Sequence, residues 1–176
     1  YADLIEKSYG GFELYQRTGT PIHPMSPLSK IFWMRHEEPK IFKQTAMFAD
    51  LKTYVLFQLY ERFVIDYSLG SATGMMNLEQ LDWDNKALEL LGIERNQLPQ
   101  LVPTTHVLTG MKKRYATLMG IDEQTPVIVG ASDGVLSNLG VNSYQKGEVA
   151  VTIGTSGAIR TVINQPKTDE KGRIFC

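Results

Sequence analysis

Two glycine-framed polar turns in the last third of the chain carry residue types suited to phosphoryl transfer. The first, residues 130–134, reads Gly-Ala-Ser-Asp-Gly and follows the apolar run 126–129. The second, residues 154–157, reads Gly-Thr-Ser-Gly and follows the β-branched run 149–153. A carboxylate base that faces an anion-binding turn is the arrangement needed to transfer a phosphoryl group to an alcohol.

The carboxylate of the first turn belongs to Asp133. A strand-like run precedes it and the helix-like run 135–140 follows it, so we expect Asp133 at the start of a helix. The free N–H groups and the dipole of a helix N-terminus favour an ionised carboxylate. Such a carboxylate could orient a substrate hydroxyl and accept its proton. The alternative is that Asp133 only caps the helix, which is a common use of Asp.

The same turn also matches the nucleophile elbow of α/β-hydrolases, G-x-S-x-G between a strand and a helix, with Ser132 as the nucleophile. In that fold the catalytic His follows the Ser along the chain. Here the three histidines, at positions 23, 36 and 106, all precede Ser132. This order counts against a hydrolase, although a catalytic His beyond the end of the given chain would make the hydrolase alternative possible again. A non-catalytic binding module is a third alternative.

The second turn lies between two β-branched runs and is therefore expected at the tip of a hairpin. Gly154 and Gly157 would let backbone N–H groups converge on an anion, and the hydroxyls of Thr155 and Ser156 would add donors. The turn thus predicts phosphate binding. The alternative is an ordinary hairpin turn, in which Gly and Ser are also common.

The segments that must position these turns are mostly helical in pattern. Ser26 opens a helix that runs to about Glu38, and Asp50 caps a further helix. Residues 63–67 predict a short strand, and residues 94–125 predict short helices and loops.

The order of elements changes near residue 125, after which strand, helix, strand, turn and strand follow. We place a domain boundary at residues 122–126, which divides the chain into residues 1–125 and 126–176. The chain does not begin with Met and ends on an apolar, strand-like segment, so we expect a fragment of a longer protein.

The composition is that of a soluble globular protein, with 43% hydrophobic and 21% charged residues. A net charge of -1 argues against a nucleic-acid partner, and no apolar run is long enough for a membrane span. The single cysteine, Cys176, cannot form an internal disulfide, which favours a reducing, cytoplasmic location. The histidines lack metal-ligand spacing, so no protein metal site is expected.

Taken together, five segments resemble the FGGY family of carbohydrate kinases, most closely its gluconate kinases. The segments are residues 18–28, Asp66-Tyr67-Ser68 with 71–74, 81–84 (Leu-Asp-Trp-Asp), 130–134 and 154–157. The resemblance implies an α/β fold of the actin/hexokinase type, with two ribonuclease-H-like domains and a cleft between them. Only part of each domain is expected in this chain, because the family's first phosphate hairpin and its adenosine-binding part are absent.

The resemblance also implies roles for the two turns. Asp133 falls on the family's catalytic base, and many relatives have Gln at the next position, where this chain has Gly134. Gly154, Thr155, Ser156 and Gly157 would bind the phosphates of ATP beside Mg²⁺. Since the first phosphate hairpin is absent, we expect the isolated chain to be inactive.

On the substrate side, the resemblance implies that His23 and Met25 line the sugar pocket, together with Ser132. A sugar acid would need a donor or cation for its carboxylate, for which His23 is the first candidate and Lys30 the second. The expected reaction is the conversion of D-gluconate to 6-phosphogluconate. The alternatives are other substrates of the family, such as xylulose, glycerol or a related polyol. The only partner implied is the small-molecule substrate, and a homodimer is compatible with the resemblance.

Overall fold

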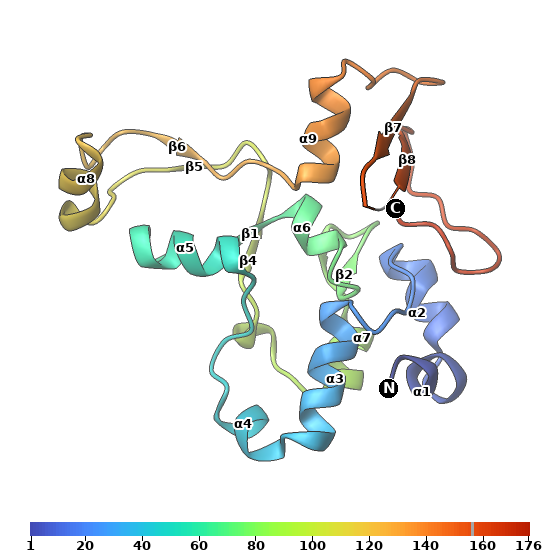
Figure 1. Ribbon diagram of the computed structural model, residues 1–176. Coiled ribbons are helices and arrows are strands. Elements are labelled where there is room, and N and C mark those ends of the chain that lie inside the picture. Colours follow the sequence, from blue (N-terminus) through green and yellow to red (C-terminus); the bar gives the residue numbers. More distant parts are fainter. Residues whose placement is uncertain (156) are drawn as a thin grey trace.

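The computed structural model describes residues 1–155 and 157–176, and Figure 1 shows how their helices and strands are arranged. The α-helices are α1 (Ala2–Ser8), α2 (Gly11–Thr18), α3 (Pro27–Glu37), α4 (Pro39–Gln44), α5 (Leu51–Tyr60), α6 (Tyr67–Ser71), α7 (Asn85–Leu91), α8 (Lys113–Met119) and α9 (Asp133–Gly140), with a 3₁₀ turn η1 (Arg95–Gln97). The strands are β1 (Val64–Asp66), β2 (Met76–Asn77), β3 (Asp82–Trp83), β4 (Gln100–Val102), β5 (Val107–Leu108), β6 (Val127–Ile128), β7 (Val149–Ile153) and β8 (Gly157–Thr161). Among these residues, none of the helices has the length and apolar character needed to cross a bilayer.

The strands pair two by two across the described ranges. β1 and β4 are parallel, with Ile65 opposite Leu101. The crossover between them contains α6, the β2–β3 hairpin and α7. The other pairs, β2–β3, β5–β6 and β7–β8, are antiparallel. The mixture of helices with parallel and antiparallel pairs agrees with an α/β fold.

Side-chain caps start the helices where the sequence predicts them. The Ser26 hydroxyl accepts the N–H of Ser29 at 3.4 Å, and Pro27 takes the first helical position of α3. The Asp50 carboxylate accepts the N–H of Thr53 at 3.1 Å at the start of α5. Both predictions are confirmed, because a cap is a local signal that needs no distant partner.

The prediction of only helices and loops over residues 94–125 is wrong. Two strands, β4 and β5, form within this segment beside α8 and the 3₁₀ turn. Their partners are β1 and β6, which lie on either side of the segment in sequence. Strands of two or three residues show no alternation of their own, so only the pairing reveals them.

Two groups of buried side chains hold the elements together. The first joins α2, α3, α7 and the β2–β3 hairpin around Leu28, Met76 and Leu91. The second joins α5, α8, β1 and β4 and includes Val129, which is only 6% exposed. Burying one such Val contributes about 1.5–3 kcal/mol. Residues 130–134, which carry Asp133, are called the carboxylate turn. The packing of Val129 thus fixes the chain just before this turn begins.

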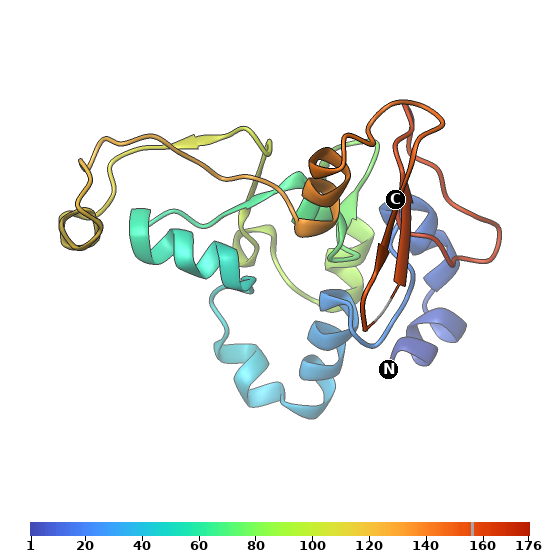
Figure 2. The ribbon, with the colours of Figure 1, turned by 45° about the horizontal axis from the view of Figure 1, so that its top comes forward.

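The last residues of the chain return to α2, as Figures 1 and 2 both show. The Tyr15 hydroxyl donates to the carbonyl oxygen of Ile174 at 2.9 Å and accepts the N–H of Asp169 at 2.9 Å. The N–H of Cys176 donates to the carbonyl oxygen of Gly19 at 2.9 Å. The segment after β8 is therefore attached to one of the first helices.

The Asp169 carboxylate makes this attachment sensitive to pH. The N–H of Arg173, 2.6 Å away, together with its guanidinium and the Tyr15 hydroxyl, holds the pKa of Asp169 well below its usual range. A lowered folded-state pKa stabilises the protein above the ordinary carboxyl pKa of about 3.9, and this contribution is lost as the pH falls. We expect Asp169→Asn to lower the melting temperature at pH 7, by an amount that shrinks as the pH falls through 4.

The comparison is made by thermal unfolding of the full-length parent and variant between pH 3 and pH 7. Glu170→Gln serves as the control, since Glu170 is an adjacent exposed carboxylate. A difference between parent and Asp169→Asn that is independent of pH would contradict the assignment.

Candidate active site

Asp133 is the first residue of α9 and is exposed to solvent, as predicted for a residue at the start of this helix. The cap position itself belongs to Ser132, so the interpretation of Asp133 as the helix cap is wrong. The Asp133 Oδ1 atom accepts the N–H of the next residue, Gly134, at 2.7 Å. This contact fixes the carboxylate at the helix end while leaving it accessible to a substrate hydroxyl.

The turn before Asp133 extends from the β5–β6 ladder. The N–H of Val129 donates to the carbonyl oxygen of His106, and the N–H of Gly130 to that of Thr104, both at 2.9 Å. Gly130 then adopts a φ of +74°, in the left-handed region that favours glycine. From this residue the chain leads through Ser132 into Asp133 at the start of α9.

A buried carboxylate lies beneath this turn. Asp66 is 0% exposed and caps α6 by accepting the N–H groups of Ser68 and Leu69 at 3.0 and 3.2 Å. It also accepts hydrogen bonds from the Ser68 hydroxyl and the Lys52 ammonium. Ser68 and Lys52 in turn contact the backbone of the turn at Ser132 and Val129, at 2.8 and 3.2 Å.

The geometry of Ser132 argues against the hydrolase alternative. Its backbone has φ −64° and ψ 153°, an ordinary extended conformation, whereas the nucleophile of an elbow sits on a strained turn. Two histidine rings are engaged elsewhere: Nδ1 of His23 accepts the N–H of Met25 at 3.2 Å, and Nδ1 of His36 lies 2.8 Å from the carbonyl oxygen of Phe32.

The second turn lies at the tip of the β7–β8 hairpin, where Ile153 faces Gly157, so the prediction of a hairpin is confirmed. Gly154, Thr155 and Gly157 are exposed, and Ser156 lies outside the described residues. A Cβ atom added to Gly157 would lie 3.8 Å from the Thr152 carbonyl oxygen, an ordinary contact distance. The packing of the hairpin therefore does not require glycine at this position.

Arg160 contacts both strand β7 and the first turn of α9, and it was not identified from the sequence. It lies on β8, and its Nη1 atom donates to the Thr152 hydroxyl at 3.2 Å. A Cβ atom added to Gly134 would lie only 3.2 Å from the Nε atom of Arg160. The guanidinium thus packs against the first turn of α9, beside Asp133. The one related signal in the sequence is the glycine at position 134, which leaves room for the guanidinium.

Three of the four residues predicted on the substrate side lie at or near the loop between α2 and α3, whereas Ser132 lies at the start of α9. His23, Met25 and Lys30 are all exposed, Met25 to 73%. The N–H of Leu28 donates to the carbonyl oxygen of Thr73 at 3.1 Å, which fixes the start of α3 against the chain that follows α6.

Helix α6 therefore lies between the start of α3, which follows the α2–α3 loop, and the carboxylate turn. Ser68 in its first turn contacts Ser132, and Thr73, just after its C-terminus, contacts Leu28 of α3. Five helical residues span about 7.5 Å. Figures 1 and 2 show α6 beside the start of α9.

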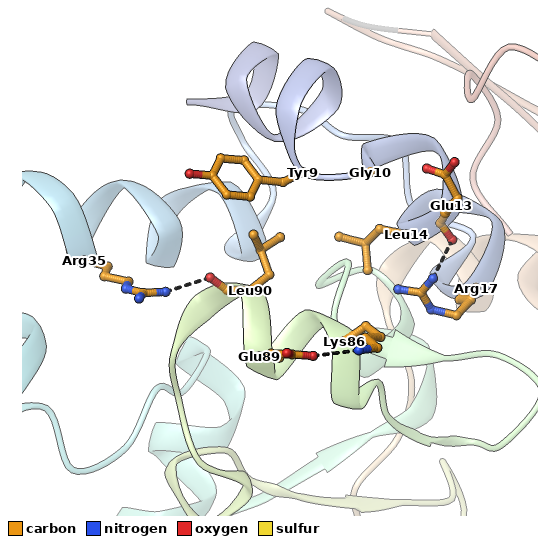
Figure 3. Close-up of a pocket in the computed structure, with 9 residues that line it drawn as sticks. All are labelled: Tyr9, Gly10, Glu13, Leu14, Arg17, Arg35, Lys86, Glu89 and Leu90. Carbon is orange, nitrogen blue, oxygen red and sulfur yellow. Dashed lines mark hydrogen bonds and ion pairs between the residues drawn. The ribbon is translucent and has the colours of Figure 1, made fainter.

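A pocket of about 530 Å³ opens elsewhere, between α2, α3 and α7 (Figure 3). Its cations already have partners. Arg35 donates to the carbonyl oxygen of Leu90 at 2.8 Å, and Lys86 pairs with Glu89 at 2.8 Å. None of the predicted site residues lines this pocket, so we do not assign the site to it.

Arg17, also at the wall of this pocket, pairs with the buried carboxylate of Asp84 at 2.9 Å. Asp84 also caps α7 through the N–H of Ala87 at 2.9 Å and accepts the Asn77 amide at 3.1 Å. Burial raises the pKa of Asp84, but the hydrogen bonds from Arg17, Ala87 and Asn77 together bring it below its ordinary value. This carboxylate is therefore ionised and joins α2, the β2–β3 hairpin and α7.

The described ranges contain no group of three or more His, Cys, Asp or Glu side chains arranged to hold a metal ion. Mg²⁺ is commonly bound by substrate phosphates with one or two carboxylates rather than by a cage of protein ligands.

Comparisons with known proteins agree with this geometry. The profile of the N-terminal domain of the FGGY family of carbohydrate kinases matches residues 1–140. A gluconokinase from Bacillus subtilis (strain 168) is 57% identical over all 176 residues, which are 34% of that protein. The chain thus spans about a third of the length of this curated relative.

Two solved structures from Lactobacillus acidophilus, described as a gluconate kinase and a ligand-bound xylulose kinase, have the same fold as this chain. Each superposes with a TM-score of 0.96 at 37% identity. Each match covers 99% of this chain and 36% of the solved one.

Proposed function

Since this chain belongs to the FGGY family of carbohydrate kinases, we propose that the full-length protein transfers the γ-phosphoryl group of ATP to D-gluconate and forms 6-phosphogluconate. The observation that carries the proposal is the 57% identity with a gluconokinase, in an alignment that spans all 176 residues of the chain. The predictions of a cytoplasmic location and of a homodimer stay predictions.

In this proposal Asp133 is the general base. Its exposed carboxylate at the start of α9 accepts the proton of the substrate's terminal hydroxyl as the new P–O bond forms. The hydrogen bond from the N–H of Gly134 orients the carboxylate and leaves further lone pairs for the substrate.

The hairpin tip is proposed to bind the phosphates of ATP, which supplies the phosphoryl group and brings Mg²⁺ with it. The exposed glycines at positions 154 and 157 permit close approach of an anion to the backbone, and the hydroxyl of Thr155 adds a donor. Arg160 extends from the same hairpin to Gly134, beside the base. A guanidinium at this position would neutralise charge on the phosphoryl group during transfer.

On the substrate side we propose that His23 and Met25, with Ser132, line the sugar pocket. The gluconate carboxylate would be bound by His23 or, less directly, by Lys30, which lies on the first turns of α3. Xylulose is the second candidate substrate, because the solved xylulose kinase matches the chain as well as the solved gluconate kinase does.

A panel of substrates tests the proposal. The full-length protein is assayed for sugar-dependent ADP formation with D-gluconate, D-xylulose, glycerol and related polyols. We expect kcat/KM for gluconate to exceed that for each other compound by about a hundredfold or more, since the charge-assisted hydrogen bond to the carboxylate is lost in a neutral sugar. A higher kcat/KM for xylulose would support the second candidate. No sugar-dependent ADP formation would contradict both.

A further inference from the structure

We infer that Lys52, Asp66 and Ser68 form a clamp that positions the catalytic base. This inference rests on the proposed function, because it gives the three residues a role through Asp133. Their contacts reach the backbone before Asp133 rather than its carboxylate, so they are positioning residues. The evidence is a set of hydrogen bonds that joins one buried carboxylate to both sides of the carboxylate turn.

The centre of the clamp is the carboxylate of Asp66, which is 0% exposed and uses both oxygens. Oδ1 accepts the hydroxyl of Ser68 and two N–H groups at the start of α6. Oδ2 accepts the ammonium of Lys52, which extends from the first turn of α5. A buried carboxylate with so many donors has a single orientation, and it imposes that orientation on its partners.

Two side chains bound to Asp66, which we call the arms of the clamp, make hydrogen bonds to the backbone of the turn that carries Asp133. The Ser68 hydroxyl gives its proton to Asp66 and accepts the N–H of Ser132 at 2.8 Å. The Lys52 ammonium donates to the carbonyl oxygen of Val129 at 3.2 Å. The arms therefore hold the residues at both ends of the segment 129–132, with Gly130 in its left-handed conformation between them.

The geometry explains why such a clamp is useful. Glycine at position 130 has more backbone freedom than any other residue, so the turn needs external contacts to fix it. Asp133 directly follows Ser132, and an error in the backbone at Ser132 displaces the base. A displacement of about 1 Å in a catalytic group can reduce the rate about a hundredfold. The clamp thus fixes the backbone before Asp133, and with it the position of the catalytic carboxylate, which the glycine-containing turn alone would not fix.

Ser68→Ala is the most direct test, because it removes the arm to Ser132 and leaves the buried Asp66–Lys52 pair in place. In the full-length protein we expect kcat to fall about 10–100-fold while KM for ATP and for the sugar changes less than about threefold. Ser68→Thr, which keeps the hydroxyl, is expected to restore most of the rate. The matched control is Ser71→Ala on the same helix, whose hydroxyl donates to the Ser68 carbonyl oxygen and is expected to be dispensable.

A double-mutant cycle with Asp133→Asn separates positioning from a general structural defect. If the clamp acts through the base, Ser68→Ala should change the residual rate of Asp133→Asn less than about twofold. A full loss in that background would overturn the inference. So would a Ser68→Ala enzyme with the kcat of the parent.

Amide hydrogen exchange tests the clamp without any reference to activity. Loss of one hydrogen bond should speed exchange of peptides that contain residues 129–134 about five- to tenfold in Ser68→Ala, but not in Ser71→Ala. If the parent phosphorylates no sugar, the proposed function fails. The hydrogen-exchange result then tests by itself whether the clamp holds the turn. Unchanged exchange in Ser68→Ala would overturn the inference even in an active enzyme.

Discussion

Replacing Asp133 by Asn in the full-length protein should lower kcat by about 10²–10⁴, because general-base catalysis contributes about that factor. The KM for gluconate should change little, since Asn has nearly the same shape and can still hydrogen-bond a substrate hydroxyl. Stability should also change little, because Asp133 is exposed and an Asn oxygen can still accept the N–H of Gly134. Steady-state kinetics of the parent and the variant measure both constants.

Asp122→Asn is the matched control for this experiment. Asp122 is likewise exposed, and its Oδ1 atom accepts one backbone N–H, that of Gln124, at 2.7 Å. It lies outside both turns, so the rate should match that of the parent. A kcat for Asp133→Asn within about tenfold of the parent would show that Asp133 is not the base.

Of the proposed substitutions, Asp84→Ala should lower the free energy of unfolding most, by about 2–4 kcal/mol. It removes a buried carboxylate that caps a helix and accepts two further hydrogen bonds. The variant loses the contacts to Ala87, Asn77 and Arg17, which join three elements. Urea denaturation of the full-length protein at pH 7 measures the change. Because the pKa of Asp84 is lowered, the effect should be complete above about pH 4 and should shrink at lower pH.

Glu89→Ala is the control for this second prediction. The Lys86–Glu89 pair lies on the same helix, but both side chains are more than 70% exposed. Exposed pairs of this kind contribute about 0.2–1 kcal/mol. Equal losses for Asp84→Ala and Glu89→Ala would mean that Asp84 does not join the elements as described.

The sequence predicts those parts of the molecule that depend on neighbours along the chain. Ser26 and Asp50 cap helices through residues three positions later, and the β7–β8 hairpin follows from two β-branched runs around a glycine-rich turn. The place of Asp133 at the start of α9 follows from the same kind of local pattern. The five short motifs also predict the actin/hexokinase-like α/β fold, which the structural matches confirm.

The contacts that shape the candidate site depend on residues far apart in sequence and could not be predicted in this way. Ser68 meets Ser132 across 64 positions, and Lys52 meets Val129 across 77. Arg160 reaches Gly134 from another element. The sequence around each of these residues shows no pattern that indicates its contact, and only folding brings the residues together. The cap of α7 illustrates the same limit, since the bonds between Asp84 and its partners Arg17 and Asn77 join residues of different elements.

Identification of the product tests the central claim most directly. The full-length protein is incubated with ATP, Mg²⁺ and D-gluconate, and the phosphorus-containing products are followed by ³¹P nuclear magnetic resonance. We expect ADP and a phosphate monoester on the terminal carbon of gluconate to form in equal amounts, and neither to form without the sugar acid. Release of inorganic phosphate alone, or a phosphate ester only with a neutral sugar, would contradict the proposal.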